Sequence, residues 1–203
     1  AYHKRSEGAA VFKTGGGKLR ERIYSNYCKR IKRSDGIMDR LSLLVKAKET
    51  AEYFTDKKFK YSQGVANSWA GAKKKKVSNC ASYVCYCLQQ LGILKPGQLF
   101  YCNRNGTVIY KGAGTKTAIS KRYRLIKVNK LPRDYKNKLK PGDICFYRLH
   151  TNIFAGVNDD NKMVWWDAGK ASTNTKKAGG TYKKIHRVIN GNQKILYVLR
   201  WKG

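Results

Sequence analysis

Acidic residues are scarce in this chain of 203 residues, and basic residues are abundant. The sequence has 12 Asp and Glu against 44 Lys and Arg, which gives a formal net charge of +32 at pH 7. No Asp or Glu lies between Lys57 and Arg133, and none follows Asp167. A charge of this sign and size favours an anionic partner, such as nucleic acid, anionic lipid or an acidic cell-wall polymer. Each of the few carboxylates is therefore a candidate for a specific role.

Long apolar runs are also missing from the sequence. No stretch of about 18 apolar residues occurs, so we expect no membrane-spanning helix, and no signal peptide is visible at the start. Hydrophobic residues still make up 41% of the chain and aromatic residues 12%, which is enough for a packed core. The length suits one domain with an extension, and we find no internal repeat.

Histidines are few, and the cysteines are not spaced as metal ligands. The six cysteines are Cys28, Cys80, Cys85, Cys87, Cys102 and Cys145. They contain no C-x-x-C pair with a histidine close by, so the pattern gives poor support for a zinc site, and no cofactor is indicated. A chain of this size does not need disulfides for its stability, so we expect free thiols, one of which is a candidate nucleophile.

Helical patterns come first along the chain, and strand patterns follow. Apolar spacing predicts helices over 23–33, 38–54 and 80–91, the second with Leu41, Leu44, Val45 and Lys48 on one face. We expect Ser78 to cap the third helix and Gly92 to end it. Short apolar runs between turn signals predict strands at 107–110, 123–128, 143–150, 153–157, 162–168 and 194–201. This order predicts an α+β fold with helices packed on an antiparallel sheet.

Cys80 is the cysteine with the most distinctive predicted surroundings. It lies in the first turn of the third helix, where free N–H groups and the helix dipole lower a thiol pKa from its usual value of about 8.5. The lysine run 73–76 precedes it and acts in the same direction. Cys85 and Cys87 lie deeper in the helix and are interpreted as small core residues. Position alone leaves Cys80 equally open as a nucleophile and as a core thiol.

A nucleophilic cysteine needs a base, and the sequence has only three histidines. His150 is predicted to end the strand 143–150, where a neighbouring element of the sheet can aim it at the helix start. Asp167, in a following strand, would orient its ring. Asp143 is an alternative acid, but its place in the turn before the strand favours a structural role. Taken singly, His150 and Asp167 are also explained as structural residues.

Several short motifs follow one another in a fixed order over residues 46–203. They are Tyr61-Ser62-Gln63-Gly64, Asn79-Cys80-Ala81-Ser82-Tyr83-Val84, Leu91-Gly92-Ile93, Leu139-Lys140-Pro141-Gly142-Asp143-Ile144 and His150. This series resembles the NlpC/P60 superfamily, papain-like cysteine peptidases that cut cell-wall peptides. The family usually has Asp before the cysteine and Ser-Gly after it, whereas this chain has Asn79 before it and Ala81-Ser82 after it.

The resemblance implies a papain-like fold, with a basic N-terminal extension at 1–45 and a catalytic domain at 46–203. It implies Cys80 as nucleophile, His150 as base and Asp167 as the group that orients the base. Tyr61 would lie beside the nucleophile and contact the substrate or the oxyanion, and Ser82 is also assigned to the substrate site. The implied activity is hydrolysis of amide bonds in peptidoglycan or pseudomurein peptides, without a metal or cofactor. We expect the protein to be secreted or virion-associated and to act at the cell wall, as a phage lysin does.

Two other functions stay open on the sequence. A non-catalytic nucleic-acid-binding or virion structural protein on a papain-like fold would use basic stretches with interleaved aromatic residues, such as 121–124. An acyltransferase with the same three residues would differ from a hydrolase only in the acceptor of the acyl group. Salt-dependent binding to DNA is expected of any chain this basic, so it discriminates poorly between these functions.

Overall fold

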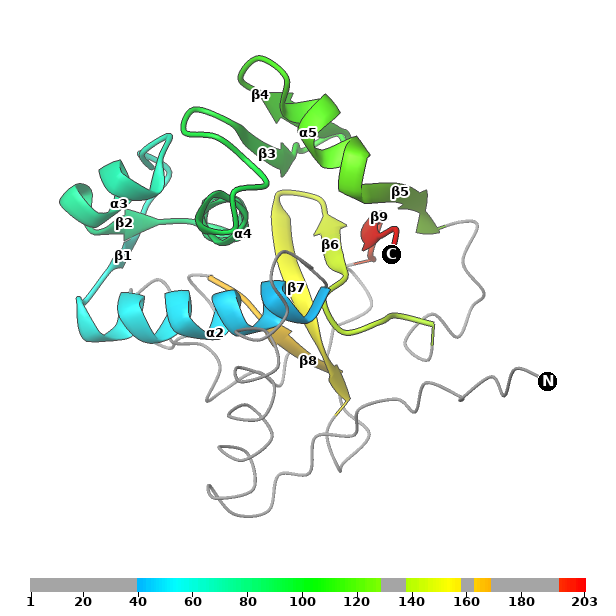
Figure 1. The fold of residues 1–203 in the computed structure, drawn as a ribbon, viewed down its shortest axis with the longest axis horizontal. Coiled ribbons are helices and arrows are strands. Elements are labelled where there is room, and N and C mark those ends of the chain that lie inside the picture. Colours follow the sequence, from blue (N-terminus) through cyan, green and yellow to red (C-terminus); the bar gives the residue numbers. More distant parts are fainter. Residues whose placement is uncertain (1–39, 129–137, 158–162, 169–193) are drawn as a thin grey trace.

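The protein has an α+β fold in which helices pack against a five-stranded antiparallel sheet (Figure 1). The structure, a computed structural model, describes residues 40–128, 138–157, 163–168 and 194–203. The helices in these ranges are α2 (Arg40–Asp56), α3 (Trp69–Lys75), α4 (Cys80–Gln90) and α5 (Thr115–Arg122). The strands are β1 (Lys60–Tyr61), β2 (Val77–Ser78), β3 (Leu99–Cys102), β4 (Val108–Lys111), β5 (Tyr123–Lys127), β6 (Ile144–Tyr147), β7 (His150–Val157), β8 (Met163–Trp166) and β9 (Tyr197–Trp201).

The main sheet has the strand order β5-β9-β6-β7-β8, and every neighbouring pair is antiparallel. β6 and β7 form a tight hairpin in which Tyr147 lies opposite His150. The prediction that His150 ends the strand 143–150 is therefore wrong, because His150 begins the next strand. The turn residue Leu149 has a φ of 58°, a conformation that glycine or asparagine usually supplies. The sequence carries no turn signal at this point, so its pattern predicts the break between the two strands at 151–152 instead of 148–149.

Two smaller pairs of strands lie outside the main sheet. β1 and β2 pair in parallel over two residues each, and β3 and β4 form an antiparallel hairpin. The sequence prediction missed α3, α5, β1, β2 and β3, and α5 lies among the strands rather than before them. These elements are short, and a two-residue strand or a polar helix of 8 residues shows no clear hydrophobic period.

Helix α2 confirms the predicted second helix, but a different face of it is buried. Its buried residues are Ser42, Leu43, Leu44, Ala47, Thr50, Ala51 and Phe54, so only Leu44 of the expected stripe is among them. The alanines of the helix lie on the face that packs closely against the core. The predicted face was based on the larger apolar residues and did not include them. The predicted domain boundary at residue 45 falls inside this continuous helix. The predicted helix 23–33, and most of the extension 1–45, lie outside the described residues.

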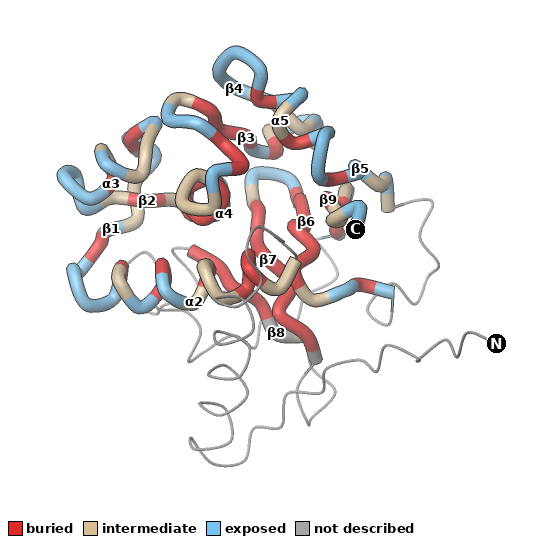
Figure 2. The backbone as a smooth tube through the Cα atoms, viewed as in Figure 1, coloured by how far each residue is buried: buried red, intermediate tan, exposed pale blue. Residues whose placement is uncertain are grey.

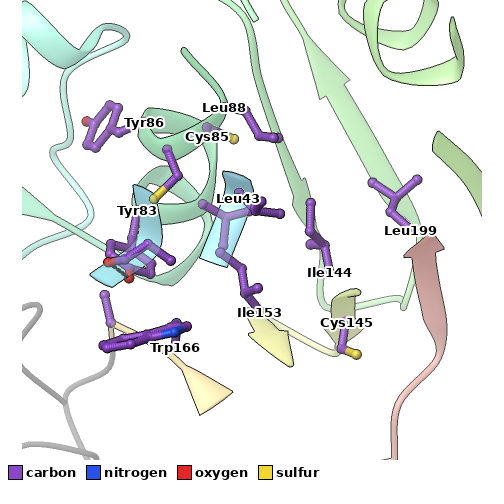
Figure 3. Packing of buried hydrophobic residues seen from close by; sticks show 14 of the residues in the cluster. Leu43, Tyr83, Cys85, Tyr86, Leu88, Ile144, Cys145, Ile153, Trp166 and Leu199 are labelled. Atoms are coloured by element: carbon purple, nitrogen blue, oxygen red, sulfur yellow. Dashed lines mark hydrogen bonds between the residues drawn. The ribbon is translucent and has the colours of Figure 1, made fainter. Parts of the chain in front are cut away.

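Helix α4 is the central helix of the core, and it packs on α2, β3 and β7. Tyr83, Cys85, Cys87 and Leu88 are all fully buried, so this helix is covered on nearly every side (Figure 2). Figure 3 shows its side chains in one cluster with those of α2 and of the sheet. Cys85 and Cys87 are core residues, as predicted. None of the helices in the described ranges combines the length and the apolar character that a membrane crossing requires.

A buried ion pair fixes the turn that leads into β6. The Asp143 side chain is 1% exposed and accepts hydrogen bonds from Arg200 of β9, with Arg200 Nη2 2.6 Å and Nε 3.0 Å from its two oxygens. The backbone N–H of Lys140 donates to the same carboxylate. Asp143 is thus held in a structural contact, as the sequence interpretation had it.

Candidate active site

Cys80, His150 and Asp167 come together from three separate elements. Cys80 opens α4, His150 opens β7, and Asp167 directly follows β8, which pairs with β7. His150 Nε2 lies 3.0 Å from Asp167 Oδ2. Because Nε2 is turned to the carboxylate, Nδ1 is the ring nitrogen left for the Cys80 thiol, with which the imidazole interacts. The arrangement contains a thiol, a base and an acid that orients the base.

The thiol of Cys80 ionises more readily than an ordinary cysteine. Its burial is the largest single influence and opposes ionisation, but the hydrogen bond and charge of His150 outweigh it, and the pKa of Cys80 is lowered. The backbone of Thr151 also favours the thiolate, whereas the charge of Asp167 acts against it. The balance favours a thiolate beside an imidazolium, which is the reactive form of a cysteine nucleophile.

The other buried thiols behave in the opposite way. Burial raises the pKa of Cys85 and of Cys87 to about 12, and it also raises the pKa of Cys102 and Cys145. Among the five cysteines in the described ranges, which are all buried and free of disulfides, Cys80 alone has a lowered pKa. Cys80 is therefore the cysteine of this group that ionises most readily.

His150 is held in its protonated form by its two neighbours. Burial disfavours the imidazolium, but the charge and hydrogen bond of Asp167, followed by the interaction with Cys80, raise the pKa of His150 above its ordinary value. The side chains of His150 and Asp167 are only 11% and 5% exposed, so water screens their attraction weakly. Asp167 is thus placed to orient the imidazole ring and to stabilise its positive charge.

Tyr61 lies beside Cys80, the residue that the resemblance implied as its neighbour. β1 pairs with β2 so that Tyr61 is opposite Ser78, which precedes Cys80 by two residues. This pairing brings the Tyr61 hydroxyl within 4.0 Å of Cys80 Sγ. Burial and then the charge of Cys80 raise the pKa of Tyr61 to about 12, so the phenol keeps its proton and acts as a donor at neutral pH.

A capping box holds the start of α4, and it uses Asn79 and not Ser78 as the cap. The Asn79 side chain accepts from the Ser82 N–H at 2.9 Å, and the Ser82 hydroxyl accepts from the Asn79 N–H at 2.8 Å. The prediction of Ser78 as the cap is wrong by one residue. The Ser82 hydroxyl is buried in these bonds, and a contact between Ser82 and substrate stays a prediction. The box closes without using the backbone N–H groups of Cys80 and Ala81.

A pocket with a volume of about 400 Å³ opens over Cys80. Its walls are the start of α4, the start of β7 with Leu149, the strand β3, and Gln63 after β1. Among the described residues that line it, Lys111 and His150 are the basic side chains, and none is an Asp or Glu. The sequence prediction named neither Leu149 nor Lys111, since an exposed leucine and one lysine among many carry no motif.

The described residues contain no group of three His, Cys, Asp or Glu that could hold a metal ion. The other two histidines of the sequence, together with Cys28, lie outside the described residues. No family model, no curated protein and no solved structure matches this chain. The geometry of the site is therefore the basis for a functional assignment.

Proposed function

We propose that the protein is a cysteine peptidase that hydrolyses amide bonds in cell-wall peptides, with a papain-like arrangement of its active site. The observation that carries the proposal is the contact of Cys80 with His150 and of His150 with Asp167, where Cys80 and His150 line a pocket. A nucleophile, a base and a group that orients the base are the parts that acyl transfer through a thioester requires.

The reaction follows from these three groups. The Cys80 thiolate attacks the carbonyl carbon of the amide, and a C–S bond forms. As the C–N bond breaks, the leaving nitrogen takes the proton of the His150 imidazolium and departs as an amine. Water then gives a proton to His150 and attacks the thioester, which releases the acid and restores the thiolate.

The negative charge on the attacked oxygen needs donors close to Cys80. The backbone N–H groups of Cys80 and Ala81 are left unused by the capping box, and the positive end of the α4 dipole lies at the same point. The Tyr61 hydroxyl, 4.0 Å from Sγ, is a third donor. Donors that are fixed before the reaction stabilise such an oxyanion strongly.

Charge supports a wall peptide as the substrate. The pocket has the basic side chain of Lys111 and no acidic residue among its described lining, so it favours a peptide that carries a carboxylate. The exposed lysines of the segments 57–60 and 73–76 extend the positive field outside the pocket. Anionic wall polymers would attract such a surface. This supports action at the wall by a secreted or virion-associated lysin, such as one of a phage.

The test is to incubate the protein with purified walls of the peptidoglycan and the pseudomurein type and to identify the released fragments by mass spectrometry. We expect new amino and carboxyl ends within the wall peptide, and none with Cys80→Ala. Thermal unfolding of Cys80→Ala checks that the fold is kept, and co-sedimentation checks that it still binds walls. Equal lysis by Cys80→Ala would overturn the proposal.

The same experiment separates the two alternatives. A non-catalytic virion or nucleic-acid-binding protein predicts no fragments from any wall. An acyltransferase predicts that an added amine ends up in the product through a new amide bond, and mass spectrometry detects this as a defined increase in mass. The first outcome also contradicts the peptidase, whereas the second keeps the acyl-enzyme and changes its acceptor.

A further inference from the structure

Leu149 is an apolar residue held in the open by a backbone conformation that leucine disfavours. It is 58% exposed, and its φ of 58° lies in the left-handed region, which is strained for a residue with a Cβ. It is the second of the two residues that connect β6 and β7, a position where glycine or asparagine fits without strain. Glycine would adopt this conformation without the strain of a Cβ. The leucine at this position therefore points to a functional reason.

The position of Leu149 indicates that reason. Its carbonyl oxygen lies 3.8 Å from Cys80 Sγ, and the residue lines the pocket over the nucleophile. Tyr101 of β3 lines the same pocket and is 41% exposed. Leu125 on β5 is the remaining exposed large hydrophobic residue of the described ranges, and it does not line this pocket. Two of the three exposed large hydrophobic residues of the described ranges thus line the pocket over Cys80.

We propose that Leu149 and Tyr101 bind an apolar side chain of the substrate, next to the amide that Cys80 attacks. The inference rests on the proposed function, since it gives the specificity of the same site. Contact with an apolar substrate residue removes both exposed side chains from water, which favours binding. The strained turn holds the leucine beside Cys80 in the free protein. The apolar surface that contacts the substrate is therefore already in place before binding.

The experiment uses irreversible probes, so that it does not depend on hydrolysis. Peptidyl epoxysuccinates carry a peptide on one or both sides of an epoxide. The epoxide alkylates a cysteine nucleophile. Two matched series have leucine or glycine next to the electrophile, and the rate constant for modification of Cys80 is measured for each by mass spectrometry. Iodoacetamide, which has no peptide, reports the intrinsic reactivity of the thiol.

The wild-type protein is expected to react about tenfold faster with the leucine probe than with the glycine probe, the effect of filling an apolar pocket. In Leu149→Gly and Leu149→Asn the ratio falls towards 1, while the iodoacetamide rate and the melting temperature are maintained. Two matched controls keep the wild-type ratio. Lys76→Gly replaces another non-glycine residue of positive φ, at 52°, and Leu125→Thr removes the exposed leucine away from the pocket.

The outcomes separate this inference from the peptidase proposal. A ratio unchanged in both Leu149 variants overturns the apolar subsite, even if wall peptides are cleaved. A ratio that also collapses in Lys76→Gly overturns it as well, because general loosening would then explain the effect. If neither peptidyl probe modifies Cys80 while iodoacetamide still does, the apolar subsite is overturned as well. If the ratio depends on Leu149 but no wall peptide is cleaved, the subsite stands and the peptidase proposal fails.

Discussion

His150 Nε2 and Asp167 Oδ2 lie 3.0 Å apart, and this contact determines which side of the imidazole is turned to Cys80. Since Nε2 is engaged by the carboxylate, Nδ1 is left for the thiol. The three groups thus act as one unit, in which the carboxylate holds a proton on the imidazole and the imidazolium stabilises the thiolate.

Alkylation of Cys80 is expected to begin at a lower pH than alkylation of an ordinary cysteine. The thiolate fraction rises as the pH passes through the pKa, and the pKa of Cys80 is lowered by His150 against the effect of burial. In His150→Ala the burial remains and the cation is gone, so the midpoint moves to higher pH. Rates with iodoacetamide between about pH 5 and 10 measure both midpoints. Equal midpoints in the two proteins would contradict the ion pair.

Asp167→Asn is expected to move the alkaline limit of peptide hydrolysis to lower pH. The charge of Asp167 raises the pKa of His150, and the proposed hydrolysis needs the proton that His150 gives to the leaving amine. Without the carboxylate this proton is lost at a lower pH. The loss of kcat at the optimum is expected to be smaller than that of His150→Ala, which is about 10² to 10⁴-fold. A complete pH profile of kcat for each variant checks the prediction.

Tyr61→Phe is expected to lower kcat by about 10²-fold, the usual effect of losing one donor to an oxyanion. The hydroxyl is 4.0 Å from Cys80 Sγ and is protonated at neutral pH. The ring of phenylalanine keeps the packing, so the melting temperature is expected to change little. As a control, Tyr110→Phe removes a hydroxyl from a tyrosine of β4 that does not line the pocket. A normal kcat in Tyr61→Phe would exclude this residue as a donor.

Lys111→Gln is expected to raise KM for peptides that carry a carboxylate and to leave KM for their amidated forms unchanged. Lys111 provides positive charge in a pocket whose described lining has no acidic residue. Loss of a charge-assisted contact weakens binding by about tenfold, equivalent to about 1.4 kcal/mol. Lys116→Gln, on α5 and outside the pocket lining, is the matched control. An equal change of KM for both kinds of peptide would contradict the role of Lys111.

Arg200→Met is expected to lower the free energy of unfolding by about 3 kcal/mol, because it leaves the Asp143 carboxylate buried without its cation. The double variant Asp143→Asn with Arg200→Met is expected to recover part of this loss. Arg124→Met is the control, since Arg124 lies opposite Arg200 on β5 and is exposed. Urea denaturation of the four proteins measures the differences. Equal destabilisation by Arg124→Met would show that the ion pair is not the cause.

The sequence predicted the long elements of the fold well and the short ones poorly. The α4 pattern was clear because its apolar residues recur at helical spacing, and the strands of the main sheet alternate or form short apolar runs. By contrast, β1 and β2 have two residues each, and they become ordered through their pairing with each other. Such an element has no pattern of its own to detect.

The sequence also named the residues that meet in the candidate site, but not the way in which they are held. A helix start and the scarcity of histidines and acids made Cys80, His150 and Asp167 candidates, and the resemblance to the NlpC/P60 superfamily implied their roles. The hairpin that turns at Leu149 could not be predicted, because leucine gives no signal for positive φ. The pocket wall formed by β3 was missed together with that strand, since its approach to α4 depends on contacts distant in sequence.

The place of β9 in the sheet has a consequence for the order in which the protein can fold. β9 lies between β5 and β6, so residues 197–201 join two parts of the sheet that are made much earlier (Figure 1). Until the ribosome has synthesised this strand, β5 and β6 each present an open edge to other chains. The buried partner of Asp143 is also absent until Arg200 has been added. The five-stranded sheet can therefore be completed only after residues 197–201 have been synthesised.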